Sequence, residues 1–421
     1  MEVRMEAIYG ICCGVDVHKK MLVACLRRGR KHETKQFGTS TEDILDLSGW
    51  LMEEGCEAVA MESTASYWKP LYNVLEASGM EVIVANARHI KTVPGRKTDV
   101  SDAAWIADLL MHGLIRASYI PPKEQREMRE FLQYRLSLVK TRADELNRLQ
   151  KMLEGGNIKL SGTVSDIMGM SSRRLLEGML SGKKFTKDDI DEMFEDGTLS
   201  RKLKASSEQI AKDCNGILSS GQTAVMRMVI AHIDELSAKI KELDGIVEGL
   251  LSQEQQAAVK ALTAMPGIKE VAARNIIAVT GTDMSRFPSP QHLCSWAGLC
   301  PGNNESAGKR RSGRTRPGNK LLRSTLVQAA QSASRCKDTF YAAQYSKIAI
   351  RRGKNRAKVA VAHSMLISIW HILHDRVEFR DLGADYYNQF NREKKAGSLM
   401  RKLADLGFSV SVEDCGLAAA Q

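Results

Sequence analysis

Residues 8–120 alternate strand-like and helix-like patterns in an order that restricts the fold more than any other feature of the chain. Three short apolar runs come first, and His18-Lys19-Lys20 between the first two is typical of a hairpin turn. The expected elements are strands at 8–17, 21–27 and 31–38, a helix at 41–54, a strand at 58–62, a helix at 67–77, a strand at 81–85 and a helix from about 99 to 110. This series predicts an α/β domain.

Four acidic residues fall within or at the ends of these elements. Asp16 lies inside the first apolar run, where burying a carboxylate is costly unless a cation or a hydrogen-bond donor holds it. Glu62 ends the fourth strand, and Asp99 and Asp102 are three residues apart, on one side of a helix. The order of elements is that of RNase H-like domains, in which a first-strand Asp and a fourth-strand acid share metal with acids of a later helix.

These four acids predict a magnesium site that acts on a phosphodiester. Oxygen ligands suit Mg²⁺, and two ions so held can activate an attacking oxygen and stabilise a leaving one. A simpler interpretation stays open, because acids at strand ends are usually solvated and Asp99 could only cap the helix that follows it.

Positive charge is concentrated in one segment of the chain. Residues 301–360 contain fifteen Lys or Arg and only two acids, Glu305 and Asp338, a local net charge of +13 in a chain whose net charge is +11. The remainder is therefore close to neutral, and this segment favours nucleic acid as a partner. The length of 421 residues predicts two or three domains.

Cysteine usage and hydropathy predict a cytoplasmic protein without a membrane segment. The nine cysteines form no CxxC pair, so we expect reduced thiols and no zinc site. His371 and His374 lie three apart without Cys partners nearby, so we expect no ligand role for them. The N-terminus shows no signal-peptide pattern, and no apolar run reaches membrane-spanning length.

Two heptad patterns predict an α-helical coiled-coil middle region. The first consists of Leu132, Leu136, Val139, Ala143, Leu146, Gln150 and Leu153, and the second of Val229, Ile233, Leu236, Ile240, Leu243, Val247 and Leu250. The arm they form could be folded on itself or shared between subunits, and ordinary amphipathic helices packed on a domain are the alternative. Residues 155–222, between the two patterns, are interpreted as an inserted small helical subdomain.

From residue 256 the sequence predicts a mainly α-helical domain that contacts nucleic acid. Thr263–Lys269 is typical of a helix-hairpin-helix-like element, whose Pro266-Gly267 turn would present backbone amides to a phosphate. It leads into the glycine-rich basic segment 301–319, which we expect to be a flexible loop. Phosphate contacts are expected from Lys309, Arg310, Arg311, Arg314, Arg316, Lys320, Arg323, Arg351, Arg352 and Lys354.

Ser306, in this basic segment, is a candidate nucleophile. Neighbouring cations would stabilise charge that builds on phosphoryl oxygens, but a serine hydroxyl needs a base or a metal to attack. No histidine lies close in sequence, so activation would have to come from the acids of the first domain. The alternatives are a basic loop that grips phosphates without chemistry, and Ser312 as a less favoured nucleophile.

Two blocks of short sequences, in the right order and separation, resemble a known family. They are Gly14-Val-Asp16, Met61-Glu-Ser-Thr64 with Tyr67-Trp68, and Gly95-Arg-Lys-Thr-Asp-Val-Ser-Asp-Ala103, followed by Pro266-Gly-Ile268, Ser285-Arg-Phe287, Trp296-Ala-Gly298, Glu305-Ser-Ala-Gly308 and Gly318-Asn319 with Leu322-Arg323. The family is that of the DEDD-type insertion-sequence transposases, some of which are bridge-RNA-guided recombinases. Ala65 departs from it, because many relatives carry glycine there, and we expect an effect only on the turn after Glu62.

The resemblance implies a composite enzyme. Asp16, Glu62, Asp99 and Asp102 of a RuvC-like domain would bind Mg²⁺ or Mn²⁺, and Ser306 would attack DNA and hold it as a phosphoserine ester. Implied partners are double-stranded donor and target DNA, a structured guide (bridge) RNA, and further copies of the chain in a homodimer or homotetramer. The expected domains are a RuvC-like domain at 8–120, a coiled-coil arm at 121–255, a transposase domain at 256–380 and a tail at 381–421.

Two other functions stay open. The first is a metal-dependent nuclease of the Holliday-junction-resolvase type, which would use water as nucleophile and leave cleaved ends with no protein attached. The second is a non-catalytic nucleic-acid binder, which would be indifferent to Mg²⁺.

Overall fold

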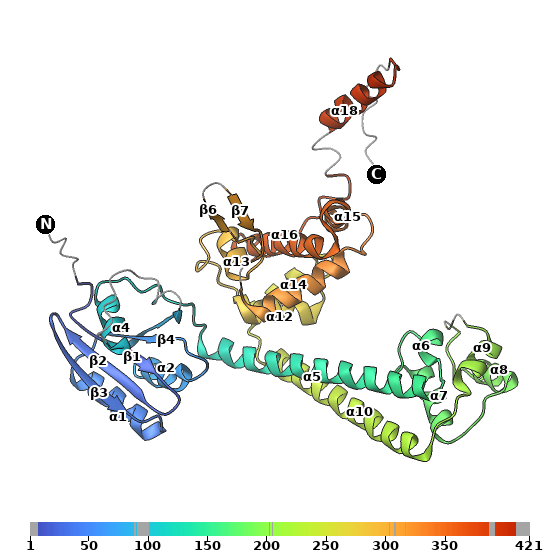
Figure 1. Cartoon of the computed structure of the whole chain (residues 1–421), viewed down its shortest axis with the longest axis horizontal. Helices are drawn as coiled ribbons and strands as arrows, with labels where there is room; N and C mark the ends of the chain where they lie inside the picture. Colours follow the sequence, from blue (N-terminus) through green and yellow to red (C-terminus); the bar gives the residue numbers. More distant parts are fainter. Residues whose placement is uncertain are drawn as a thin grey trace. The chain divides into compact units, whose positions relative to one another are not determined.

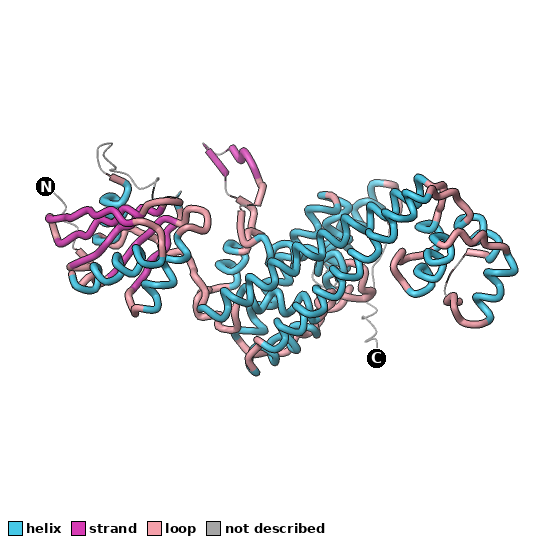
Figure 2. Tube along the Cα trace, turned by 90° about the horizontal axis from the view of Figure 1, so that it is seen from below, coloured by secondary structure: helices cyan, strands magenta, loops and turns pink. Residues whose placement is uncertain are grey.

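The computed structural model describes residues 7–409 apart from 88–89, 91–100, 202, 204, 303, 307–308, 316 and 387–391, and it leaves out the side chains of 304–306, 309–312 and 392–395. The chain divides into two compact units, Met1–Pro122 and Lys123–Gln421. Figure 2 shows the strands gathered in the sheet of the first unit and in one short ribbon of the second, with the other regular elements helical. No described helix combines the length and apolar character needed to cross a membrane.

The first unit is built on a five-stranded mixed sheet of order β3-β2-β1-β4-β5 (Figure 1). Its strands are β1 (Ile11–Val17), β2 (Leu22–Arg28), β3 (Lys31–Phe37), β4 (Ala58–Glu62) and β5 (Glu81–Ala85). The first three pair antiparallel, whereas β1, β4 and β5 are parallel. This mixed sheet, followed by helices, is compatible with the predicted RNase H-like domain.

Helices cover both faces of this sheet. The helices α1 (Thr41–Glu53) and α2 (Trp68–Ala77) bury apolar side chains against Val15 and Val17 of β1. On the other face α4 (Asp102–Met111) packs with Cys12 of β1 and with Ala58 and Ala60 of β4. Because alternate residues of a strand point to opposite faces, β1 is buried on both sides, which explains its nearly continuous apolar run.

The second unit contains a pair of long helices, α5 (Lys123–Gly155) and α10 (Ser220–Gly249), which lie side by side (Figure 1). The pair is joined by Leu138, Leu236 and Leu243 and by the ion pair in which Arg135 Nε donates to Asp244 Oδ1 at 2.6 Å. In α10 the predicted heptad residues from Val229 to Val247 are buried or half-buried.

In its middle, the predicted heptad row of α5 is not the row that packs on α10. Leu136 and Val139 are 42% and 37% exposed, and Ala143 is exposed as well. The contact with α10 uses another row of α5, in which Leu138 is buried and Arg142 Nε donates to Ser237 Oγ at 2.7 Å. Helix periodicity allows either the row with Leu136 and Val139 or the row with Leu138 to face a partner helix. The polar contacts of α5 with Asp244 and Ser237 of α10 go with the second row.

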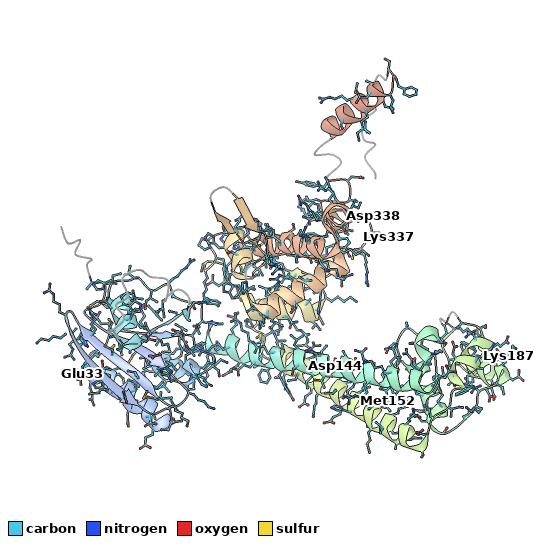
Figure 3. All side chains as sticks on the ribbon, viewed as in Figure 1. Glu33, Asp144, Met152, Lys187, Lys337 and Asp338 are labelled. Carbon is cyan, nitrogen blue, oxygen red and sulfur yellow. The ribbon has the colours of Figure 1, made fainter. Side chains whose placement is uncertain are left out.

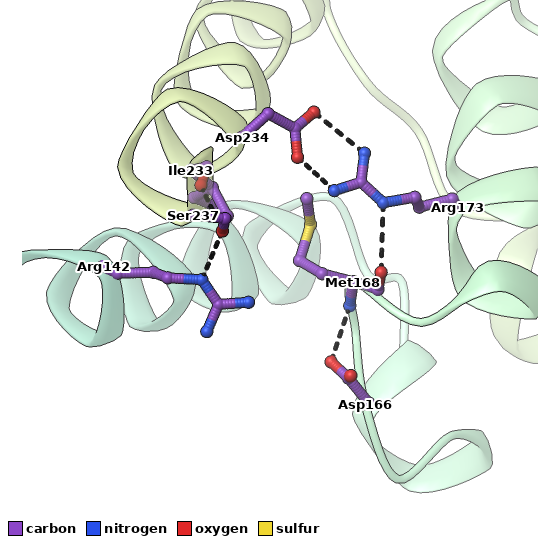
Figure 4. Close-up of polar contacts among 7 residues, drawn as sticks. All are labelled: Arg142, Asp166, Met168, Arg173, Ile233, Asp234 and Ser237. Atoms are coloured by element: carbon purple, nitrogen blue, oxygen red, sulfur yellow. Dashed lines mark hydrogen bonds and ion pairs between the residues drawn. The ribbon is translucent and has the colours of Figure 1, made fainter. Parts of the chain in front are cut away.

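The inserted subdomain has a core of its own. It consists of α6 (Leu160–Thr163), α7 (Met170–Leu180), α8 (Lys187–Glu195) and α9 (Ser207–Cys214), which pack on the adjoining ends of α5 and α10. Arg173 of α7 makes two hydrogen bonds to the carboxylate of Asp234 on α10, and its Nε donates to Met168 O at 3.0 Å (Figure 4). Figure 3 shows Asp144 and Met152 on α5 and Lys187 on α8.

The C-terminal part of the second unit is mainly helical. Its elements are α11 (Gln253–Thr263), α12 (Glu270–Thr280), α13 (Pro290–Trp296), the ribbon β6 (Asn304–Ser306) and β7 (Lys309–Ser312), α14 (Lys320–Ala333), α15 (Phe340–Arg352), α16 (Lys354–His374) and α18 (Arg392–Asp405). Its core is centred on the fully buried side chains of α12, α14 and α16. The turn between α11 and α12 holds Gly267 at φ +85°, where a Cβ would lie 2.4 Å from Ala329 O of α14.

Candidate active site and nucleic-acid interface

Asp16 and Glu62 lie next to each other on one face of the first sheet. In the parallel pair β1–β4, Val15 is opposite Met61, so the register brings Asp16 beside Glu62 at the ends of their strands. Asp16 follows Gly14 by two residues and Glu62 follows Ala60 by two, so both carboxylates point to the face that α4 covers. Both residues are half-buried, with 23% of the Asp16 side chain exposed.

The absence of a side chain at Gly14 brings α4 onto this face. A Cβ at Gly14 would lie 2.3 Å from both Ala103 O and Ala107 N of α4. Cys12 Sγ lies 3.6 Å from Ala107 O, so β1 and α4 run in opposite directions and the end of β1 approaches the start of α4. Asp102 is the first residue of α4, directly after the N-cap Ser101.

The prediction that Asp99 and Asp102 share one side of a helix is wrong, because α4 begins only at Asp102, after the extended N-cap Ser101. Asp99 lies outside the described residues, so its position relative to the other three acids stays a prediction. Among the residues that are described, no group of three His, Cys, Asp or Glu side chains is close enough to hold a metal ion. The acids that are described offer carboxylate oxygens alone, which suit a hard divalent cation rather than a zinc site. Asp102 also has a structural explanation, because an acid in the first turn of a helix is stabilised by the helix dipole.

Two neighbours of the acids were missed by the sequence reasoning. His18 Nε2 donates to Asp16 Oδ2 at 2.9 Å, and Thr64 Oγ1 donates to Glu62 Oε1 at 3.0 Å. Each neighbour is two residues from its acid. For His18, the alternation of side chains along a strand was the signal that could have indicated the contact.

The basic segment that was predicted as a flexible loop contains a two-stranded antiparallel ribbon. Its register pairs Ser306 with Lys309 and Glu305 with Arg310, with an irregularity between Asn304 and Glu305. We call β6, β7 and their connection the serine hairpin. Ser306 is the last residue of β6, and the two residues that connect it to β7 lie outside the described part.

The base of the serine hairpin is tied to the helical core. Gly302 N donates to Arg314 O at 2.8 Å. A Cβ at Gly318 would lie 2.3 Å from Gly298 N, so these two glycines approach closely, and Arg323 Nη1 donates to Gly298 O at 3.2 Å. The family-like sequences that contain Gly298, Gly318 and Arg323 therefore meet at the base of the serine hairpin.

The structure places the predicted phosphate contacts unevenly. Arg314, Lys320, Arg351, Arg352 and Lys354 are exposed, whereas Arg323 is half-buried by its contact with Gly298. The side chains of Lys309, Arg310, Arg311 and Arg316 lie outside the described residues.

Comparison with known proteins finds matches over both regions. Residues 13–158 match a family described as transposase, the DEDD type of IS110, and residues 259–345 match the transposase IS116/IS110/IS902 family. The transposase for insertion sequence element IS1111A of Coxiella burnetii is 24% identical over 379 residues, 87% of each chain. The protein y4qE of Sinorhizobium fredii, provisionally named a transposase, is 26% identical over 335 residues, 75% of this chain and 70% of that one.

Proposed function

The chain belongs to the IS110 family of DEDD transposases, and from this premise we propose that it recombines DNA with a serine nucleophile and an acidic metal site. The observation that carries the proposal is the placement of Asp16 and Glu62 in register on the face that α4 covers, with Asp102 at the start of that helix. Asp99 completes the proposed set of acids. Ser306, at the last paired position of β6, is the proposed nucleophile.

The proposed metal ligands are Asp16, Glu62, Asp99 and Asp102, and the proposed ion is Mg²⁺, with Mn²⁺ as a substitute. DEDD transposases depend on a divalent metal, and the all-carboxylate donors fit one. A cation held there would lower the pKa of a bound hydroxyl and balance charge on the phosphoryl oxygens. His18 and Thr64 would orient the two strand acids through their hydrogen bonds.

Ser306 would exchange DNA strands in two steps that conserve the number of phosphorus–oxygen ester bonds. In the first, the hydroxyl loses its proton, Oγ bonds to phosphorus, and one deoxyribose oxygen leaves as a hydroxyl. In the second, a deoxyribose hydroxyl of another strand bonds to the same phosphorus and Ser306 leaves with a proton. No outside energy source is needed, because each step forms one ester bond and breaks one.

The remaining parts of the proposal concern partners. Exposed cations such as Arg351, Arg352 and Lys354 would hold DNA backbones, which leaves the choice of sequence to a structured guide RNA that pairs with donor and target. The pair α5–α10 would be the coiled-coil arm, and its exposed row with Leu136 and Val139 would join copies of the chain into a dimer or tetramer.

A covalent adduct is the direct test. The purified chain would be incubated with Mg²⁺, a donor-junction duplex and the RNA flanking its gene, then denatured and mapped by mass spectrometry. We expect a DNA phosphate on Ser306 that is lost in Ser306→Ala, in Asp16→Ala and without metal. Ser312→Ala, in the same hairpin, is the matched control and should form the adduct normally. An adduct that persists in Ser306→Ala would refute the nucleophile assignment.

The second candidate is a nuclease that uses water. The hydrogen bond between His18 and Asp16 favours it, because an imidazole at this position could take the proton of an attacking water. Cleaved ends with no attached protein, unchanged in Ser306→Ala and lost in Asp16→Ala, would identify this activity.

A further inference from the structure

The α15–α16 corner, residues 350–356, is a tight and exposed junction between two helices. Tyr341 Oη donates to Ser368 Oγ at 2.9 Å and Gln344 Nε2 donates to Ser364 Oγ at 2.8 Å, so α15 and α16 pack antiparallel. Gly353 alone connects them, at φ +84°, a conformation that favours glycine. The corner is therefore held in place by the packed helices on which it stands.

The corner carries strong positive charge with no nearby acid to balance it. Between Asp338 and Asp375 the chain has six Lys or Arg residues and no Asp or Glu. Asp338 precedes α15, at the end of that helix away from the corner. Within the described part of the chain, no carboxylate lies within ion-pair distance of Arg351, Arg352 or Lys354, all of which are exposed.

Two of the six basic residues lie at positions that are electrostatically unfavourable for the fold. Lys354 and Arg356 lie in the first turn of α16, which has no acid and no side-chain cap. A cation at the positive end of a helix dipole is unfavourable. Such a placement is understandable if a ligand with negative charge occupies the corner.

Ile350 is the unusual residue in this setting. Its side chain is 87% exposed although it lies directly before Arg351 and Arg352. An aliphatic side chain is stabilised when it leaves water, so a ligand of the corner cations that also offers an apolar surface would be stabilised by contact with Ile350. Base pairs offer such a surface between their stacked faces, and duplex DNA surrounds it with phosphates.

We propose that Ile350 inserts between base pairs of duplex DNA and kinks it, while the cations of the α15–α16 corner hold the flanking phosphates. Apolar wedges of this kind partly unstack a base step from the minor groove. The occupant is DNA rather than an apolar protein surface, because the charge complementarity is with a polyanion. The inference deepens the DNA-binding part of the proposed function and does not depend on cleavage.

DNA bending by the full-length chain tests the wedge. A duplex of about 30 base pairs with central TA steps, which kink readily, would carry a fluorescent donor and acceptor at its ends. The protein would carry Ser306→Ala, so that bending is measured without chemistry. We expect Ile350→Ala to abolish the approach of the ends and to weaken binding about tenfold. A two-base mismatch at the centre should restore both, because it removes the unstacking cost.

Matched variants separate the wedge from the cations. Ile217→Ala, at an aliphatic side chain that is 83% exposed in the inserted subdomain, should leave bending and affinity unchanged. Arg352→Ala should lower the slope of log affinity against log salt by about one and keep the bend.

Three results would overturn the proposal. The first is equal bending by Ile350→Ala and its parent. The second is an equal effect of Ile350→Ala on binding to an RNA duplex of the same sequence. The third is a changed oligomeric mass with unchanged bending, which would make Ile350 a protein contact. If DNA bending is observed but no Ser306 adduct forms, the proposed recombinase chemistry is refuted and the proposed wedge is not.

Discussion

Gly14→Ala tests whether the close contact between β1 and α4 builds the acidic site. The added Cβ would lie 2.3 Å from Ala103 O and from Ala107 N, whereas ordinary contact begins at 3.4 Å. The atoms in the way belong to backbone, so no side chain can rotate to make room. The helix must therefore move by about 1 Å, which is the kind of overpacking that costs about 1–3 kcal/mol.

The same movement should affect activity more than stability. Asp102 is the first residue of α4 and moves with it, whereas Asp16 and Glu62 remain on the sheet. A displacement of about 1 Å at a catalytic constellation can reduce the rate about 100-fold. We therefore expect Gly14→Ala to fold, with an unfolding free energy lower by about 2 kcal/mol. If Ser306 and the acids act as proposed, the variant should form the Ser306 adduct at about one hundredth of the normal rate.

Urea unfolding and the rate of adduct formation measure the two effects separately. Gly49→Ala is the control, because no heavy atom lies within 4 Å of the added Cβ and Gly49 is inside α1. It should stabilise the chain by roughly 0.5–1 kcal/mol and leave the rate unchanged. A Gly14→Ala protein as stable and as active as its parent would refute the claim that this contact positions Asp102.

Two further predictions concern the turn after Glu62 and the inserted subdomain. Ala65 has φ +47°, a conformation that costs a residue with a Cβ roughly 1–2 kcal/mol, so Ala65→Gly should raise the unfolding free energy measured in urea, and a decrease would contradict it. The Arg173 guanidinium holds the pKa of Asp234 below its ordinary value, so the pair stabilises the fold above about pH 4 and loses this effect as the pH falls through the lowered pKa. Because the two side chains are 37% and 46% exposed, the cost of Arg173→Gln should be greater at pH 7 than in acid by less than about 1 kcal/mol, and a pH-independent cost in urea unfolding would exclude this cause.

The sheet and its two strand acids could be predicted because their determinants are local. β1 reads as an apolar run since both of its faces are covered, and one polar residue in such a run, Asp16, is conspicuous. The row of α5 that meets α10 could not be predicted, because Leu136 and Leu138 are both apolar and the choice depends on Arg135 finding Asp244 more than 100 residues away. The hydrogen-bond partner of Asp16, His18, is only two residues away. It was not predicted because His18-Lys19-Lys20 was interpreted as a hairpin turn.

The serine hairpin shows why composition misleads at a basic, glycine-rich segment. Glycine and basic residues indicate a loop, yet Asn304–Ser306 and Lys309–Ser312 pair, and the base is fixed through Gly302 and Arg314. A free loop would lose backbone entropy when it docks on DNA, at about 1–2 kcal/mol for each residue ordered. Pairing removes much of that loss before the substrate arrives, because β6 already holds the backbone of Ser306. If Ser306 is the nucleophile, replacing Gly302 with proline, which removes its N–H, should therefore slow adduct formation while leaving the rest of the domain folded.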